Sequence, residues 1–154
     1  MEGLLAMRRV PLFAHLSLEQ LEAIGKFMTE AQYLAGEVVV REGDPGDELY
    51  VMLEGEARAV KHYGSPQEIA LTTMSPDGVG YFGEIAIFDR APRSATVVVT
   101  QDARLLALEG GRFMDLILQS PEISLEIFKV LTQRLRSAEE RLRAQDDRTR
   151  GASG

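Results

Sequence analysis

The turn signals between residues 31 and 110 are the feature that most restricts how this chain can fold. Glycine and proline recur there and separate short runs that are rich in apolar and β-branched residues. The strongest signal is Gly43-Asp44-Pro45-Gly46, and weaker ones occur at Gly36, Gly55, 63–66, 76–78 and 110–111. The predicted strands lie between these signals, at residues 32–34, 37–41, 49–53, 56–62, 68–74, 95–100 and 104–109. Many short strands at this spacing are typical of a β-sandwich or a jelly roll.

Helical patterns occur on both sides of the strands. Apolar residues between positions 4 and 10 predict a short helix that Pro11 stops. Ser17 and Gln20 form a capping-box pattern at the start of a second helix, which reaches Met28. Beyond the strands, residues 112–118 predict a short helix, and a longer one starts at Pro121 with Ser120 as its N-cap.

These patterns divide the chain into parts of one domain, which suits its 154 residues and its 45% apolar content. Residues 1–30 form an N-terminal helical subdomain and residues 31–110 form the β-domain. Residues 111–144 form the C-terminal helices, and the polar residues 145–154 are expected to be a disordered tail.

The long C-terminal helix carries an apolar seam. Its members alternate at spacings of three and four residues: Phe128, Leu131, Leu135, Ala138 and Leu142. The seam can cover the β-domain of its own chain, or it can pair two copies of the chain, and both can hold together. We expect a homodimer through the C-terminal helix.

Composition argues against several classes of function. The chain has no cysteine, and its two histidines, His15 and His62, lie far apart, so we expect no metal site and no catalytic constellation. A formal net charge of −7 opposes nucleic-acid binding, which needs a basic surface. No run of residues resembles a signal peptide or a membrane span. We therefore expect a cytoplasmic protein that is not an enzyme, with no nucleic-acid or membrane partner.

The segment from Gly80 to Val97 combines groups that suit a nucleotide. Gly83 allows a close approach of the backbone, and residues 84–88 are long enough for one or two helical turns. The start of such a helix offers unpaired N–H groups to a phosphate, and Arg93 adds a charged two-pronged donor. Glu84 only accepts hydrogen bonds when ionised, so it suits a sugar hydroxyl. The segment thus predicts a site for a phosphate and a free ribose hydroxyl.

This segment resembles the phosphate-binding cassette of the cyclic nucleotide-binding domain family. The matching residues are Phe82, Gly83, Glu84, Ile85, Ala86, Pro92, Arg93, Ser94, Ala95, Thr96 and Val97. We call residues 82–97 the cassette. The resemblance extends over about residues 11–133 and implies an α+β, mainly β fold. That fold is an eight-stranded antiparallel β-jelly roll with N-terminal helices and a C-terminal helical lid.

The resemblance also implies roles for individual residues. Arg93 would pair with the cyclic phosphate, together with the backbone N–H groups of Ala86 and of Ser94 or Ala95. Glu84, helped by the Gly83 N–H, would hold the ribose 2′-hydroxyl. The resemblance does not identify the residues that contact the base. Thr132, Arg134 and Ser137 on the long helix are candidates, with surface exposure as the default interpretation of each, and Met74 is a further candidate that plain core packing explains equally well.

The ligand implied by the resemblance is cAMP or cGMP, and we expect no other cofactor. The Ser94 hydroxyl, directly after the arginine, suits the phosphate or a guanine amino group, and we favour cAMP. Such a module would reposition its terminal helices and so signal to a protein effector that the sequence does not identify. An alternative is a ligand-free interaction module in which Glu84 and Arg93 pair with each other.

Overall fold

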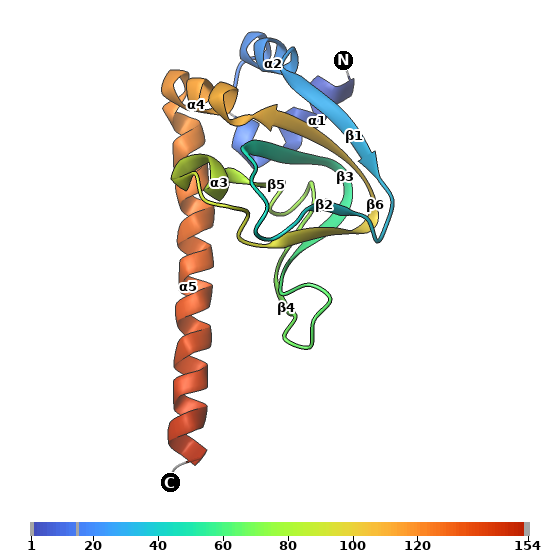
Figure 1. Cartoon of the computed structure of the whole chain (residues 1–154). Coiled ribbons are helices and arrows are strands. Elements are labelled where there is room, and N and C mark those ends of the chain that lie inside the picture. Colours follow the sequence, from blue (N-terminus) through green and yellow to red (C-terminus); the bar gives the residue numbers. More distant parts are fainter. Residues whose placement is uncertain (1, 15, 153–154) are drawn as a thin grey trace.

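A computed structural model describes residues 2–14 and 16–152 (Figure 1). Its helices are α1 (Glu2–Arg9), the 3₁₀ helix η1 (Pro11–Phe13), α2 (Leu18–Gly25), α3 (Glu84–Asp89), α4 (Gly110–Gln119) and α5 (Pro121–Ala152). Its strands are β1 (Met28–Tyr33), β2 (Val38–Val40), β3 (Glu48–Lys61), β4 (Ile69–Met74), β5 (Tyr81–Phe82) and β6 (Thr96–Glu109).

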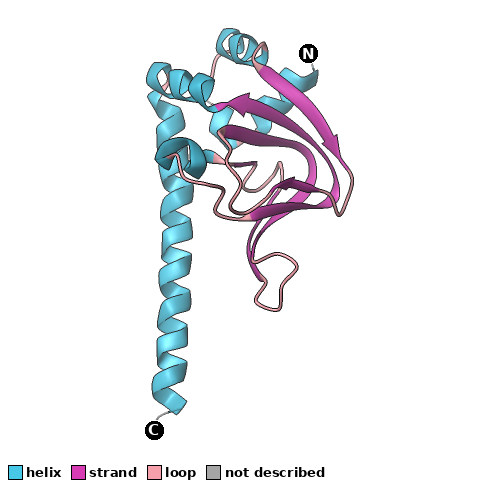
Figure 2. Ribbon diagram, viewed as in Figure 1, coloured by secondary structure: helices cyan, strands magenta, loops and turns pink. Residues whose placement is uncertain are grey.

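The strands form one curved antiparallel sheet. Its path is β1-β6-β3-β4, and β2 pairs with β6 while β5 pairs with β3. In Figure 2 the strands curl into a partly closed barrel, and the helices gather along its top and one side. This arrangement confirms the predicted jelly-roll class of fold.

The described residues form six strands, whereas the resemblance implied eight. Two predicted breaks do not end a strand, so four of the seven strands predicted from turn signals merge into two, and the short strand β5 is an addition that the turn signals did not predict. Strand β3 continues through Gly55, which has φ 89° and packs against the backbone of Asp102 on β6. The β3–β6 register shifts around Glu54 and Glu56, as expected where a bulge bends a strand without ending it. Residues 95–100 and 104–109 likewise lie on one continuous strand, β6, from Thr96.

Strands β3 and β6 bury both faces along part of their length. Alternate residues of β3, Leu49, Val51 and Leu53, belong to an outer core beneath the helices. Met52 and Ala57 belong to an inner core inside the barrel, with Val97, Val99 and Leu105 of β6. The outer core fixes the helices against the barrel, and the inner core fills the interior of the barrel.

The predicted capping box at the start of α2 is confirmed. The Ser17 hydroxyl accepts a hydrogen bond from the Gln20 N–H, and the Gln20 side chain accepts one from the Ser17 N–H. The Gln20 amide also donates to the buried Ser120 hydroxyl over 3.1 Å. Ser120 therefore links α2 to the junction between α4 and α5. Helix α5 begins at Pro121, as predicted. Helix α2 ends at Gly25, and Met28, which we expected on that helix, begins β1.

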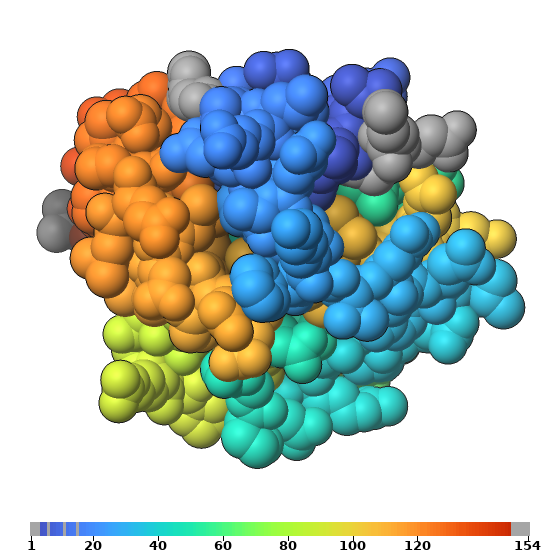
Figure 3. Space-filling view, turned by 90° about the horizontal axis from the view of Figure 1, so that it is seen from above, coloured from blue at the N-terminus to red at the C-terminus, as the bar shows by residue number. Residues whose placement is uncertain are grey.

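The N-terminal helices and α4 cover one end of the barrel side by side (Figure 3). Helix α5 then runs along the barrel and beyond it (Figure 1). Its 32 residues give a length of about 48 Å. Residues 145–152, expected as a disordered tail, are part of this helix, whereas residues 153–154 lie outside the described residues. No helix in the described chain has both the length and the hydropathy required to cross a membrane.

Candidate nucleotide site

A cavity of about 510 Å³ lies between the barrel and α5, and we call it the α5 cavity. Its size falls within the range of about 300–1,000 Å³ that is usual for small-molecule sites. The barrel contributes inner-core residues such as Met74 and Phe82, and the cassette contributes the residues from Gly83 to Ala86 and from Arg93 to Ala95. The α5 helix closes the cavity with Val130, Gln133, Arg134, Ser137, Ala138 and Arg141.

Arg93 is a buried cation in the wall of this cavity. Its side chain is 6% exposed, and its Nη2 donates to the Glu48 carbonyl oxygen over 3.1 Å. A longer contact of 3.4 Å joins Nη1 to the Gly83 carbonyl oxygen, and the guanidinium lies 5.8 Å from the centre of the Tyr50 ring. Within the described residues, no carboxylate lies within ion-pair distance of Arg93. A buried guanidinium held only by neutral groups has capacity for an anion.

Two glycines make room for this guanidinium. A Cβ atom at Gly46 would lie 2.5 Å from the Arg93 Nε atom. A Cβ atom at Gly83 would lie 2.8 Å from Nη1 and 2.5 Å from the Glu48 carbonyl oxygen. Gly83 also has φ 97°, a conformation that glycine adopts without strain. The loop before β3 and the turn before α3 therefore approach Arg93 as closely as they do because both positions lack a side chain.

Glu84 begins α3 and is 1% exposed. Its Oε1 atom accepts a hydrogen bond of 2.8 Å from Nη1 of Arg134 on α5, and the two side chains form an ion pair. Glu84 and Arg93 do not pair with each other in the described structure, in contrast to the alternative of a self-neutralised cassette. The carboxylate instead connects the cassette to α5.

Tyr81 lies beside this ion pair. Burial, followed by the charge of Glu84, raises the pKa of the Tyr81 hydroxyl far above its ordinary value, and Arg134 opposes part of the rise. The hydroxyl is therefore protonated at neutral pH. Within the described structure, neither the Tyr81 hydroxyl nor the Arg134 Nε atom has a hydrogen-bond partner. The Glu84–Arg134 ion pair and its neighbour Tyr81 thus leave two polar groups without a hydrogen-bond partner among the described residues.

The structure brings together most of the residues that the sequence suggested. The candidates that line the α5 cavity are Met74, Gly83, Glu84, Ala86, Arg93, Ser94, Ala95, Arg134 and Ser137. Thr132 is the exception, because its hydroxyl donates to the Phe128 carbonyl oxygen and it lines a separate groove on α5. Two residues along a helix correspond to about 200° of rotation, so Thr132 and Arg134 point to nearly opposite sides.

Sequence reasoning missed other lining residues, among them Gln133, Ala138 and Arg141 on α5. Helical spacing from Arg134 was the available signal, since Val130, Ala138 and Arg141 stand four before, four after and seven after it. No cluster of metal-ligating side chains occurs among the described residues.

Comparison with known proteins agrees with this geometry. The family model described as "Cyclic nucleotide-binding domain" matches residues 30–120. A CRP-like cAMP-activated global transcriptional regulator of Mycobacterium tuberculosis is 30% identical over 130 residues, which are 84% of this chain and 57% of that protein. A cAMP-dependent protein kinase regulatory subunit of Dictyostelium discoideum is 33% identical over 109 residues, covering 70% of this chain and 32% of the relative.

Among solved structures, the catabolite activator protein of Thermus thermophilus superposes with a TM-score of 0.73 at 30% identity. That match covers 86% of this chain and 61% of the other. The chain thus spans little more than half the length of the transcriptional regulators that it matches. Because one relative is named a transcriptional regulator, our expectation of no nucleic-acid partner gains no support. From the extent of the family match and the geometry of the cassette, this chain belongs to the cyclic nucleotide-binding domain family.

Proposed function

We propose that this chain is a sensor module that binds cAMP in preference to cGMP and transmits binding through α5. The observation that carries the proposal is the Arg93 guanidinium, which is buried in the cavity wall without a carboxylate partner among the described residues. Burying an unpaired cation is unfavourable for folding alone, and an anionic ligand would compensate for it.

The cavity offers a group for each part of the ligand. The cyclic phosphate binds to Arg93, to the N–H of Ala86 and to the N–H of Ser94 or Ala95. The ribose 2′-hydroxyl donates to Glu84, and the Gly83 N–H supports the same contact. The base packs against Met74 and the cavity-facing side of α5, which includes Arg134. The Ser94 hydroxyl lies next to the proposed phosphate position. Two relatives are named for cAMP, which supports adenine over guanine as the base for this chain.

Binding changes the position of α5, because the ligand and α5 share groups. Glu84 already accepts a hydrogen bond from Arg134, so a ribose hydroxyl at Glu84 competes with that ion pair or rearranges it. A ligand shifts a conformational equilibrium only when it binds one state more tightly, and this shared carboxylate supplies such a difference.

The exposed face of α5 also supports a homodimer. Phe128, Leu135 and Leu142 recur every seven residues and are 60%, 61% and 65% exposed. The other two members of the seam face their own chain, since Leu131 packs against the outer core and Ala138 lines the cavity. The seam thus packs in part against its own chain, and the spacing of its exposed members supports a second copy of α5 as the partner for the rest.

Isothermal titration of the whole chain tests the function. We expect cAMP to bind with a Kd of micromolar order or below, cGMP to bind more weakly, and 5′-AMP, which lacks the cyclic diester, to bind more weakly than either. Absence of binding heat for both cyclic nucleotides at millimolar concentration would favour the ligand-free interaction module instead.

A further inference from the structure

Residues 42–44 hold the cassette segment that follows Pro92. The Arg93 N–H donates to the Asp44 carbonyl oxygen over 2.9 Å, and the Gly43 N–H donates to the Arg93 carbonyl oxygen over 2.8 Å. The Glu42 N–H donates to the buried Thr96 hydroxyl over 3.0 Å. These bonds fix Arg93 and Thr96 but leave the two residues between them, Ser94 and Ala95, to be held by something else.

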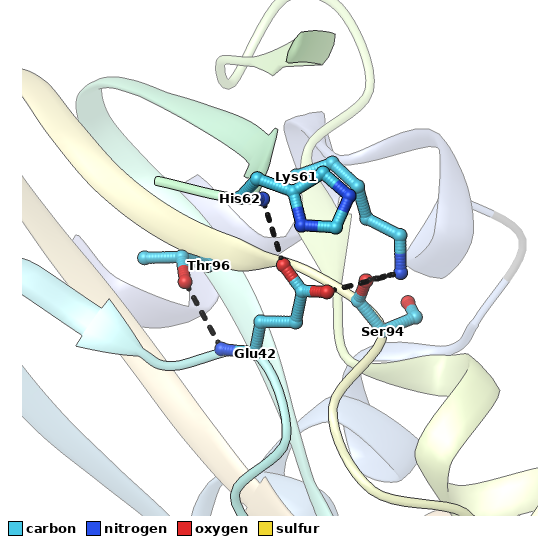
Figure 4. A network of polar contacts seen from close by, with 5 residues as sticks. All are labelled: Glu42, Lys61, His62, Ser94 and Thr96. Atoms are coloured by element: carbon cyan, nitrogen blue, oxygen red, sulfur yellow. Dashed lines mark hydrogen bonds and ion pairs between the residues drawn. The ribbon is translucent and has the colours of Figure 1, made fainter. Parts of the chain in front are cut away.

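Lys61, at the end of β3, supplies that contact (Figure 4). Its Nζ atom donates to the Ser94 carbonyl oxygen over 2.7 Å. The same ammonium group lies 3.3 Å from Oε2 of Glu42, whose Oε1 accepts the His62 N–H over 2.9 Å. The His62 N–H, and secondarily Lys61, lowers the pKa of Glu42, so this carboxylate is ionised at neutral pH. The ammonium is thus directed to the Ser94 carbonyl by a carboxylate that is itself fixed.

The direction of the Ser94 carbonyl determines the direction of the next N–H. The described chain contains no cis peptide bond, so the Ser94 C=O and the Ala95 N–H belong to one planar trans unit and point to opposite sides. The Ser94 oxygen points to Lys61, which is not among the residues lining the α5 cavity, whereas Ser94 and Ala95 are. Fixing the oxygen therefore turns the Ala95 N–H away from Lys61.

We propose that Lys61 is a positioning residue for phosphate recognition: it orients the Ser94–Ala95 peptide so that the Ala95 N–H faces the anion beside Arg93. This inference rests on the proposed function, because it concerns the phosphate end of the same site. Lys61 does not touch the ligand, and its effect passes through one peptide unit. Glu42 supports it by holding the ammonium in place.

An ordinary surface ion pair would behave differently. The Lys61 and Glu42 side chains are 40% and 27% exposed, and pairs of that kind contribute little to folding. If Lys61 had only that role, its replacement would change neither ligand affinity nor the environment of the Ala95 amide. A positioning role predicts a selective loss of affinity with little change in thermal stability.

The test compares Lys61→Met with Lys26→Met, which removes the same charge from an exposed position outside the site. In titrations with the cyclic nucleotide that the wild-type chain binds more tightly, we expect Lys61→Met to raise Kd about 10- to 150-fold, the loss expected for one hydrogen bond to a charged group. Lys26→Met should leave Kd unchanged, and Lys61→Arg, which can still donate to the carbonyl, should return it to within about 3-fold of wild type. Glu42→Gln should give an intermediate loss.

A ¹H–¹⁵N spectrum provides the second readout. In the wild-type chain the Ala95 amide signal should move on ligand addition, and in Lys61→Met it should start from a different position and move less. Equal Kd values for Lys61→Met and Lys26→Met would overturn the proposal. So would a loss that Lys61→Arg fails to restore together with an unaltered Ala95 response.

If the wild-type chain bound neither nucleotide, the proposed function would fail. The spectra without ligand would still decide whether Lys61 orients this peptide, and identical Ala95 signals in both variants would contradict it.

Discussion

Gly83 shows how one residue without a side chain lets two parts of the site meet. Its backbone has φ 97°, and the Glu48 carbonyl oxygen and the Arg93 guanidinium both occupy the space that a Cβ atom would need. Gly36 has nearly the same backbone conformation, φ 95°, but nothing lies within 4 Å of its Cβ position. Comparing substitutions at these two glycines therefore distinguishes the effect of backbone strain from the effect of crowding.

We predict that Gly83→Ala destabilises the chain more than Gly36→Ala does. Both substitutions place alanine at positive φ, which costs about 1 kcal/mol of folding free energy. Only at Gly83 does the added Cβ atom also displace the Glu48 carbonyl oxygen and the Arg93 guanidinium. Urea denaturation measures the difference, which we expect to be at least about 1 kcal/mol. Only Gly83→Ala should weaken cyclic nucleotide binding. Equal destabilisation and equal affinity in the two variants would contradict the crowding that we describe.

Residues of the site differ in how far the sequence could predict them. Gly83, Glu84 and Arg93 lie within one short segment, so their types and spacing were enough to place them together. Lys61 and Glu42 come from other segments: the register of β3 with β6 brings Lys61 to the cassette, and Glu42, after β2, reaches it through Thr96 and Lys61. No local pattern marks such contacts. Thr132 was misplaced because its residue type was considered without its position on the helical circumference.

At the scale of elements, the central contact is between α3 and α5. The Glu84–Arg134 ion pair joins them, with Glu84 almost fully buried and Arg134 30% exposed on its side chain. Removal of one partner from a buried pair leaves an uncompensated charge, which commonly costs about 3–5 kcal/mol. The partial exposure of Arg134 reduces that cost here.

We predict that Arg134→Gln loosens the middle of α5. Amide hydrogen exchange from Val130 to Ala138 should become faster, because the helix loses its charged contact with the cassette. Arg136→Gln is the matched control, since Arg136 lies on the groove side of α5, away from the cavity. If both variants exchanged at the wild-type rate, the ion pair would not hold α5 against the barrel.

A second prediction concerns the outer face of the same helix. Leu135→Glu should convert a homodimer into a monomer, because it places a charge in the middle of the exposed stripe of Phe128, Leu135 and Leu142. Ala144→Glu adds the same charge at an exposed position two residues beyond Leu142, off the stripe, and should leave the dimer intact. Light scattering at tens of micromolar distinguishes the masses. A wild-type chain of monomer mass would refute pairing through α5.

The elements themselves were predictable where local chemistry decides them. The capping box of Ser17 and Gln20 predicted the start of α2, and Pro121 predicted the start of α5. The strands were divided too finely because Gly55 reads as a turn, whereas in the fold it is a bulge inside β3. The end of α5 was set too early because its polar residues lack an apolar pattern, and a helix continuing from a packed segment does not need one.

At the scale of the whole molecule, the barrel, the cassette and α5 meet around one cavity. The inner core forms its floor, the cassette provides the charged groups and α5 forms the remaining wall. Arg93 is a buried guanidinium without a carboxylate partner among the described residues, so the group that favours anion binding does not favour folding.

The most direct test of this account is the affinity of Arg93→Met for cAMP beside that of Arg58→Met, which removes the same charge from the exposed surface of β3. We predict that Arg93→Met raises Kd about 30- to 5,000-fold, the loss of about 2–5 kcal/mol expected for a desolvated charge partner, while Arg58→Met binds as the wild type does. The thermal midpoint of ligand-free Arg93→Met should stay within a few degrees of wild type, since methionine relieves the burial of a cation. Equal affinities in Arg93→Met and Arg58→Met would contradict the central claim that Arg93 is the anion-binding group.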